Sequence, residues 1–274
     1  MTSAAPAVPF AGSADQSPVA GFVRQSAAIA EAELRKLARD PTELLTRAVQ
    51  PALWLIVFGE VFTRIRAIPT GNLSYLEFMA PGVLAQSVLF ISIFFGIAAI
   101  WERDLGIVHK LLVSPAYRGA LVTGKALSAG LRALSQAVII YVLALVMGIH
   151  LQFGPLALLG VAAIVMLGAA LFATFSLCVA CIVKTRERFM GIGQVLTMPI
   201  FFASNAIYPL ALMPGWLKAV SSINPLTYEV DGLRALMIQG GTSVYGLPLD
   251  IAVLCGITAV LVVIAARMYP RMAV

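Results

Sequence analysis

The sequence predicts an all-α integral membrane protein with six transmembrane helices, and two observations predict that class. First, 60% of the 274 residues are hydrophobic and only 12% are charged, whereas soluble domains carry about 25% charged residues. Second, the apolar residues are gathered into six runs of about 17 to 28 residues, each long enough to cross a bilayer. Because only a helix satisfies its own backbone hydrogen bonds in hydrocarbon, each run is expected to be helical.

The elements are expected in the following order. Residues 1–27 are rich in Ala, Pro and Ser, show no cleavable signal peptide and are expected to form a disordered tail. Residues 28–40 place apolar side chains at helical spacing, which suits a helix lying in the membrane interface, with a solvated helix as the alternative. The six spans follow within one transmembrane domain at residues 28–274. They are expected at residues 44–62, 79–101, 131–149, 156–183, 190–212 and 249–266.

Lysine and arginine indicate the orientation of the spans. If the N-terminus lies in the cytoplasm, all but four of the 19 basic residues lie on the cytoplasmic side. The exceptions are Arg64, Arg66, Lys218 and Arg234. The positive-inside rule therefore predicts that both termini are cytoplasmic. The net charge of +6 follows from this topology, suits a surface on anionic lipid and does not indicate nucleic-acid binding.

The largest cytoplasmic element is expected between the second and third spans, at residues 102–125. An apolar stripe runs through it, formed by Leu105, Val108, Leu111 and Leu112. A short amphipathic helix of this kind either rests on lipid or docks into the groove of a partner. Its charges of both signs favour a protein partner. The basic loop at residues 184–188 is either a second contact or a positive-inside anchor.

One stretch of this element, GALVTGKA from Gly119 to Ala126, comes within one residue of the phosphate-binding pattern G-x-x-x-x-G-K-[ST]. Ala126 replaces the hydroxyl residue that ligates Mg²⁺ in such loops, and no buried strand is expected before the stretch. A nucleotide site is therefore not expected in this chain. Cys178 and Cys181 form a C-x-x-C inside an apolar span, where two thiols without further ligands do not favour metal or redox chemistry.

The middles of the predicted spans carry almost no ionisable residues, and only Glu60, near one end of the first span, comes close. Since ion-coupled transporters keep such residues within the membrane, this pattern weighs against secondary transport. Aromatic and polar side chains in the spans suit an amphiphilic or apolar cargo instead, although packing or lipid contact explains each phenylalanine taken singly. The candidate pathway residues are Gln86, Phe90, Phe94, Phe201, Asn205 and Tyr208.

Two stretches carry a resemblance to a known family. The first is ERDLGIVHKLLVSPAYRGALVTGK, from Glu102 to Lys125, and the second is YPLALMPGW from Tyr208, followed by NPLTYEVDGLR from Asn224. With the six-span plan, they make the chain from about residue 28 to its end resemble the membrane subunit of an ABC-2 type exporter, the family that includes drug-resistance and nodulation-factor permeases. One departure from the family is GIVH from Gly106, where many members have G-T-L-E. This difference leaves open the charge of the contact that the segment makes.

The resemblance implies that ATP is bound elsewhere. A separate nucleotide-binding ATPase subunit would hold Mg-ATP, and this chain would bind no cofactor or metal and have no catalytic residue. Two copies of the chain, or one copy and a related permease, would sit on two such ATPases, with residues 102–125 as the coupling segment. The residues expected to couple to the ATPase are Glu102, Arg103, Asp104, Gly106, His109, Lys110, Leu111, Leu112, Pro115, Arg118 and Arg186.

The resemblance also implies short re-entrant helices in the outer region at residues 213–248, which fits neither a full span nor a hydrophilic loop. Within that region, Glu229, Asp231 and Arg234 lie close enough in sequence to pair with one another on a helix. We therefore expect local pairing there and not a substrate site.

The function expected from the sequence is export across the bacterial cytoplasmic membrane, by the multi-pass permease subunit of an ATP-driven exporter. The cargo is a drug, a lipid or a glycan-linked molecule. One alternative is an ATP-independent secondary transporter or channel, and a dependence of flux on ATP or on an ion gradient separates the two. A membrane-embedded enzyme is a third class, but no nucleophile–base pair or acidic metal-binding cluster is visible in the sequence.

Overall fold

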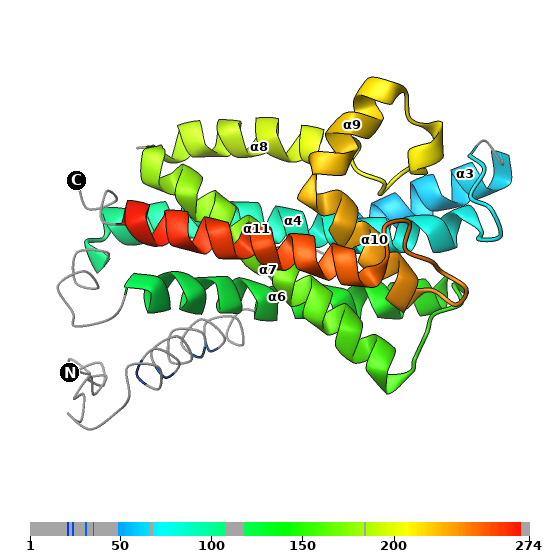
Figure 1. The fold of residues 1–274 in the computed structure, drawn as a ribbon, viewed down its shortest axis with the longest axis horizontal. Helices are drawn as coiled ribbons and strands as arrows, with labels where there is room; N and C mark the ends of the chain where they lie inside the picture. Colours follow the sequence, from blue (N-terminus) through cyan, green and yellow to red (C-terminus); the bar gives the residue numbers. More distant parts are fainter. Residues whose placement is uncertain are drawn as a thin grey trace.

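The computed structural model describes residues 49–65, 68–107, 118–183 and 185–269, together with the single positions Gly21, Arg24, Glu31 and Arg35. All elements within these residues are helical, apart from one isolated β-bridge between Leu151 and Ile238. The long helices lie roughly along one axis of the molecule (Figure 1). The predicted all-α class is therefore confirmed for the described part of the chain.

Four described helices are long and apolar enough to cross a membrane, so the chain is a membrane protein. They are α4 (Tyr75–Asp104), α6 (Arg118–Val146), α7 (Pro155–Ile182) and α11 (Leu247–Met268). The shortest of them, α11, has 22 residues and rises about 33 Å. That length matches the hydrocarbon core of a bilayer, which is about 30 Å thick.

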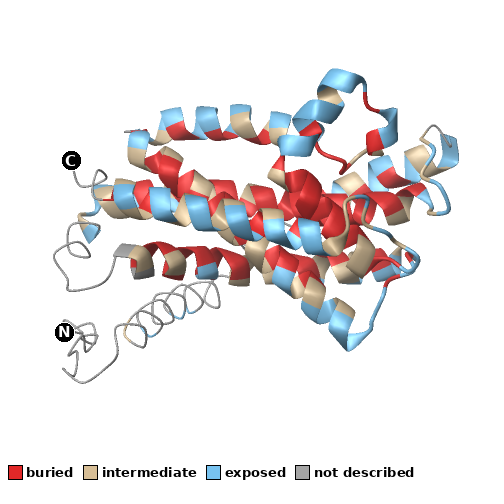
Figure 2. Cartoon of the chain, in the orientation of Figure 1, coloured by how far each residue is buried: buried red, intermediate tan, exposed pale blue. Residues whose placement is uncertain are grey.

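Helix α4 is the central element of the bundle. It begins at a capping box, in which the Ser74 hydroxyl accepts from the Glu77 amide and the Glu77 carboxylate accepts from the Ser74 amide. A side-chain cap of this kind stabilises a helix by about 1 kcal/mol. Most of α4 is buried, whereas α11 keeps much of its surface exposed (Figure 2). An apolar, exposed surface of this extent is what a bilayer covers.

The first predicted span, at residues 44–62, is described only from Val49 onward. Residues 49–65 are helical and include a π-helical stretch, η1 (Trp54–Gly59), which continues into α3 (Glu60–Ile65). Gly59 lets this segment approach α4, because a Cβ at that position would lie 2.4 Å from Leu76 Cδ2. The described part of this segment is shorter than the four long helices.

The fifth predicted span, at residues 190–212, is wrong in its extent. Helix α8 (Arg186–Phe202) ends ten residues earlier, and only a short 3₁₀ turn, η2 (Leu210–Leu212), lies in the remainder. The chain turns away because Pro199 lies in the last turn of α8, and because Ser204 Oγ donates to the Phe201 carbonyl at 2.7 Å. The following backbone then packs on α4, where a Cβ at Gly82 would lie 2.4 Å from the Ala206 carbonyl oxygen.

Two short helices lie within residues 213–248, the predicted outer region. Helix α9 (Gly215–Ile223) is largely exposed, and α10 (Pro225–Met237) is almost wholly buried against α4, α7 and α11. Asn224 caps α10 by accepting from the Leu226 amide at 3.0 Å. Both helices lie in the half of the molecule that holds the start of α4 (Figure 1). Short helices are thus present in this region, and their re-entrant position in the membrane stays a prediction.

The predicted third span, at residues 131–149, begins too late. Helix α6 starts at Arg118 and therefore contains the GALVTGKA stretch in its first turns. Residues 102–125, expected as one cytoplasmic element, are thus largely the ends of two long helices, with residues 108–117 outside the described part. A phosphate-binding loop needs exposed backbone amides between a strand and a helix, and a continuous helix does not provide them.

Candidate functional site

The coupling residues predicted from the sequence fall into two groups. Glu102, Arg103 and Asp104 are the last residues of α4, Gly106 follows in a turn with φ of 69°, and Arg186 opens α8. The others lie outside the described residues, except that Arg118 begins α6 without a described side chain. Those outside are His109, Lys110, Leu111, Leu112 and Pro115. The structure therefore places only the base of the expected coupling segment, and its role in coupling stays a prediction.

Charged side chains at this base join the ends of neighbouring helices, and we name the group Glu102, Arg103, Asp104, Lys125 and Arg186 the charged clamp. Glu102 on α4 forms an ion pair with Lys125 on α6. The two side chains are only 17% and 7% exposed. Removing one partner from a buried pair costs about 3–5 kcal/mol, because it leaves an uncompensated charge. Lys125 is therefore a buried partner of Glu102 and not a phosphate ligand.

The second pair of the clamp joins α4 to α8. Arg186 donates to one oxygen of Asp104 from two nitrogens, at 2.7 Å and 3.1 Å. Its guanidinium also lies 3.6 Å from the centroid of the Trp101 ring, which adds a cation–π contact. Arg103 connects α4 to the end of α7 by donating to the Val183 carbonyl at 3.4 Å. The clamp thus links four helix ends on one side of the bundle.

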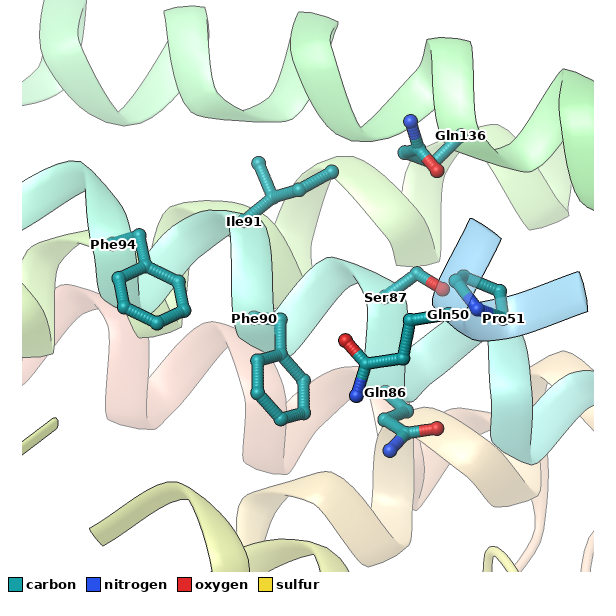
Figure 3. A pocket seen from close by; sticks show the side chains of 8 residues that line it. All are labelled: Gln50, Pro51, Gln86, Ser87, Phe90, Ile91, Phe94 and Gln136. Carbon is teal, nitrogen blue, oxygen red and sulfur yellow. The ribbon is translucent and has the colours of Figure 1, made fainter. Parts of the chain in front are cut away.

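A cavity of about 360 Å³ lies beside α4, and we name it the α4 cavity. It belongs to the second predicted functional region, the cargo pathway. It is lined by Gln50, Pro51, Gln86, Ser87, Phe90, Ile91, Phe94 and Gln136. Figure 3 shows the amide groups of Gln50 and Gln86 on the same side of α4 as the Phe90 ring, with Gln136 across from them on α6. The lining combines amides with aromatic rings and contains no charged residue. Such a surface suits a neutral, hydrogen-bonding group attached to an apolar body.

The cavity gathers half of the predicted pathway residues. Gln86, Phe90 and Phe94 line it, and the two phenylalanine rings stack with centroids 6.3 Å apart. Phe201 lies elsewhere, in edge contact with Trp54 at 5.8 Å. The other two residues belong to the irregular segment after α8. There, Tyr208 donates to the Phe202 carbonyl and Asn205 donates to Asp231.

Helix α10 brings a buried group of ionisable side chains into the bundle. Arg234 lies 3.9 Å from Asp231 and donates to the Asn205 carbonyl at 2.8 Å. Burial lowers the pKa of Arg234 to about 10, so its guanidinium remains charged at neutral pH. Glu229 does not join this pair, because its carboxyl group lies against Gly168 of α7, 2.3 Å from the position that a Cβ would occupy. Local pairing is thus seen for Asp231 and Arg234 only.

Glu229 has no hydrogen-bond partner for either carboxyl oxygen within the described residues. Its side chain is fully buried, and burial raises the pKa of Glu229 well above its usual range. An ionised carboxylate in such a place would be costly, so the neutral acid is the favoured form.

Several residues of these sites were not predicted from the sequence. Gln50, Ser87 and Gln136 line the α4 cavity, and Lys125 closes the clamp. No sequence pattern connects these positions, because they come from helices far apart in the chain. Asp250 was detectable, since it is a carboxyl group inside the last predicted span, where ionisable residues are rare. The expectation concerned only the middles of the spans, and Asp250 lies at the start of its span.

Comparisons with known proteins agree with this architecture. The profile of the ABC-2 type transporter family matches residues 24–238. The chain is 29% identical over 218 residues to the transport permease ycf38 of Cyanophora paradoxa, covering 78% of this chain and 74% of the relative. It is 24% identical over 229 residues to the daunorubicin resistance ABC transporter permease protein DrrB1 of Streptomyces coeruleorubidus, covering 84% and 80%. It is 26% identical over 200 residues to the inner membrane transport permease YadH of Escherichia coli K12, covering 70% and 73%.

Proposed function

The chain belongs to the ABC-2 type transporter family, and we propose that it is the membrane-spanning permease subunit of an ATP-driven exporter. The observation that carries the proposal is the charged clamp, which ties α4, α6, α7 and α8 together beside the segment through which the resemblance implies contact with an ATPase. Two relatives are named as ABC transporter permeases for drug resistance. The chain is thus a transport permease, with ATP hydrolysis assigned to a partner subunit that binds Mg-ATP.

We propose six membrane crossings, with both termini in the cytoplasm of a bacterium and the clamp at the cytoplasmic face. The four long helices supply four crossings, and residues 49–65 and α8 supply the other two. Basic residues at the clamp end support this orientation, since cytoplasmic loops are enriched in Lys and Arg. They include Lys125, Arg186, Arg188 and Arg267. Residues 213–248, with α9 and α10, then form the outer re-entrant region.

Coupling is a population shift between two states of a permease pair. The pair consists of two copies of this chain, or of one copy and a related permease. ATP bound by the partner ATPases favours one state, and the motion enters at the coupling segment, residues 102–125. Because the clamp joins Glu102 and Asp104 to Lys125 and Arg186, a displacement of the end of α4 moves the ends of α6 and α8 with it.

The α4 cavity is the proposed cargo contact. Its amides offer both donors and acceptors, and its phenylalanines offer apolar surface. This combination supports an amphiphilic cargo with an uncharged polar group, such as a drug, a lipid or a glycan-linked molecule.

A secondary transporter remains the second candidate function, and one observation favours it. Glu229, Asp231 and Asp250 are fully buried carboxyl groups, and proton-coupled transporters use such groups. These buried carboxyl groups therefore keep ion coupling open as an energy source. The family match still favours ATP as the energy source.

Co-purification tests the proposal. We expect the tagged chain, expressed in its native host, to retain an ABC ATPase carrying an intact G-x-x-x-x-G-K-[ST] loop. Vesicles containing both proteins should then accumulate cargo only with ATP. Cargo movement that follows an imposed proton gradient and ignores ATP would establish the secondary transporter instead.

A further inference from the structure

Two buried carboxyl groups meet at one serine near the start of α11. Ser243 Oγ lies 2.9 Å from Asp231 Oδ2 and 2.7 Å from Asp250 Oδ2. The same oxygen accepts the Gly246 amide at 2.6 Å. Asp231 and Asp250 have no exposed surface. Ser243 is half-buried and connects the pair to the surface of the molecule.

The hydrogens at this junction can be counted. A serine hydroxyl carries one hydrogen and two acceptor lone pairs. It can donate to one of the two carboxyl groups, and it already accepts the Gly246 amide with one lone pair. The second carboxyl contact therefore needs a hydrogen of its own, since two oxygens without a hydrogen between them repel each other at hydrogen-bond distance. One of the two carboxyl groups must be protonated.

The surrounding donors decide which carboxyl group holds that proton. Asp231 Oδ2 accepts the backbone amides of Val244 at 2.6 Å and Tyr245 at 3.0 Å, and its other oxygen faces Asn205 and Arg234. Donors and a cation of this kind stabilise the ionised form. Asp250 has none of them, and its Oδ1 is buried without a hydrogen-bond partner in the described part of the chain. The proton therefore belongs on Asp250, which donates to Ser243 Oγ while Ser243 donates to Asp231.

Other titratable groups around the pair do not change this assignment. Helix α10 contributes Arg234, which already faces Asp231, and Glu229, whose carboxyl group lies against Gly168 of α7. Tyr228 and Tyr245 contribute only their rings, which meet at a tilt with centroids 5.1 Å apart. Helix α7 carries no ionisable residue other than two cysteines. Among the described residues of this region, the buried carboxyl groups Glu229, Asp231 and Asp250 therefore outnumber the buried arginine Arg234.

Asp231 and Asp250, which meet at Ser243, hold one wall of a second cavity. This cavity has a volume of about 600 Å³, and its lining includes Arg234, Thr242, Val244 and Tyr245. Asp231 fixes the segment at residues 242–245 through the Ser243 hydroxyl and two backbone amides. If Asp250 lost its proton, two like charges would share one serine, and their repulsion would be strong in a buried place.

We propose that Asp250 is a proton-binding site, and that its proton holds the segment at residues 242–245 against α10 as a closed wall of the second cavity. Loss of the proton releases that wall. The site lies at the end of the bundle opposite the clamp, so under the proposed function the proton is exchanged with the external side. The wall therefore closes at low external pH and loosens at high external pH.

Infrared spectroscopy of the purified full chain in an ester-free detergent tests the proton directly and needs no transport. In a Glu229→Gln background, which removes the other buried unpartnered acid, we expect an absorption of a protonated carboxyl group at mildly acidic pH, where exposed carboxyl groups are still mostly ionised. Asp250→Asn in the same background should abolish it. Ser243→Ala should shift its frequency, because the acceptor of the Asp250 hydrogen bond is lost. An unchanged absorption after Asp250→Asn would overturn the assignment.

A spin label at an exposed wall position tests the consequence. Thr242→Cys, in a chain whose three native cysteines are replaced by alanine, carries the label. We expect its mobility to rise with pH in the parent chain and to stay low at every pH in the Asp250→Asn variant, since asparagine keeps the pair at one negative charge. Equal pH responses in the two chains would refute the proposed wall. Because neither measurement uses ATP or cargo, failure of the exporter proposal would leave both results interpretable.

Discussion

At the scale of single residues, the ion pair between Asp104 and Arg186 offers a sharp test of the clamp. Both side chains are more than one-third exposed, so the pair stabilises the fold by no more than about 1 kcal/mol. Asp104→Arg or Arg186→Asp should therefore fold normally and yet lower ATP-driven export several-fold. The physical reason is that α8 no longer follows α4. Export and ATPase rates in reconstituted vesicles measure the effect.

The charge-swapped double variant is the matched control for that pair. Asp104→Arg combined with Arg186→Asp restores the attraction and should recover much of the export lost in each single variant. A recovery of this kind is a coupling energy between the two positions. If the loss of export in the double variant equals the sum of the losses in the two single variants, the pair plays no part in coupling.

The α4 cavity makes a prediction about cargo. Gln86→Leu keeps the size of the side chain but removes its hydrogen-bonding amide, which is worth about 0.5–1.5 kcal/mol. We expect cargo affinity to fall roughly two- to tenfold, seen as a higher cargo concentration for half-maximal ATPase stimulation. Gln152→Leu, an exposed position outside the cavity lining, is the control. Equal effects at both positions would remove the cavity from the transport pathway.

Three of the predicted pathway residues lie on one helix, and their role in transport stays a prediction. Gln86, Phe90 and Phe94 repeat at helical spacing on α4, so their common face follows from the sequence, and the cavity gathers them. Lys125 and Asp250 escaped notice for another reason. Their partners, Glu102 and Ser243, lie on other elements, and no local pattern reveals such contacts.

At the scale of helices, the close packing of the segment after α8 against α4 depends on Gly82. A Cβ at Gly82 would lie within 3 Å of three backbone atoms of Ala206, and backbone cannot give way as a flexible side chain does. Gly82→Ala should destabilise the protein by about 1–3 kcal/mol through overpacking. Thermal unfolding in detergent measures the loss.

Gly256→Ala on α11 is the control, because nothing lies within 4 Å of a Cβ at that position. Alanine favours a helix over glycine by about 1 kcal/mol, so this variant should be as stable as the parent or slightly more stable. A similar loss of stability in both variants would show that helix composition, and not contact with Ala206, controls the effect.

The long helices α4, α7 and α11 were predictable because their apolar runs are unbroken and exceed the thickness of a bilayer. Two boundaries were not. The span that contains α8 was predicted too long, because the apolar run of the sequence continues past Phe202. In the structure, Pro199 and Ser204 turn the backbone there. The span within α6 was predicted to start too late, because the charge at Lys125 interrupts the apolar run, although Lys125 is neutralised by a partner on α4.

At the scale of the whole molecule, the two ends of the described helix bundle differ in chemistry. The clamp end is held by ion pairs between helix termini, and the other end contains the buried acids and the short helices α9 and α10. The proposed transport cycle needs both ends: force enters at the clamp, and the wall beside Asp231 opens or closes far from it. The central claim is that this force comes from a partner ATPase.

Transport by purified components tests that claim most directly. Vesicles are prepared with the chain alone, with the chain and its co-purified ABC ATPase, and with an ATPase whose phosphate-loop lysine is replaced. We expect cargo to accumulate against its gradient only in the second preparation and only with Mg-ATP. Accumulation by the chain alone, or by the preparation with the disabled ATPase, would contradict the account.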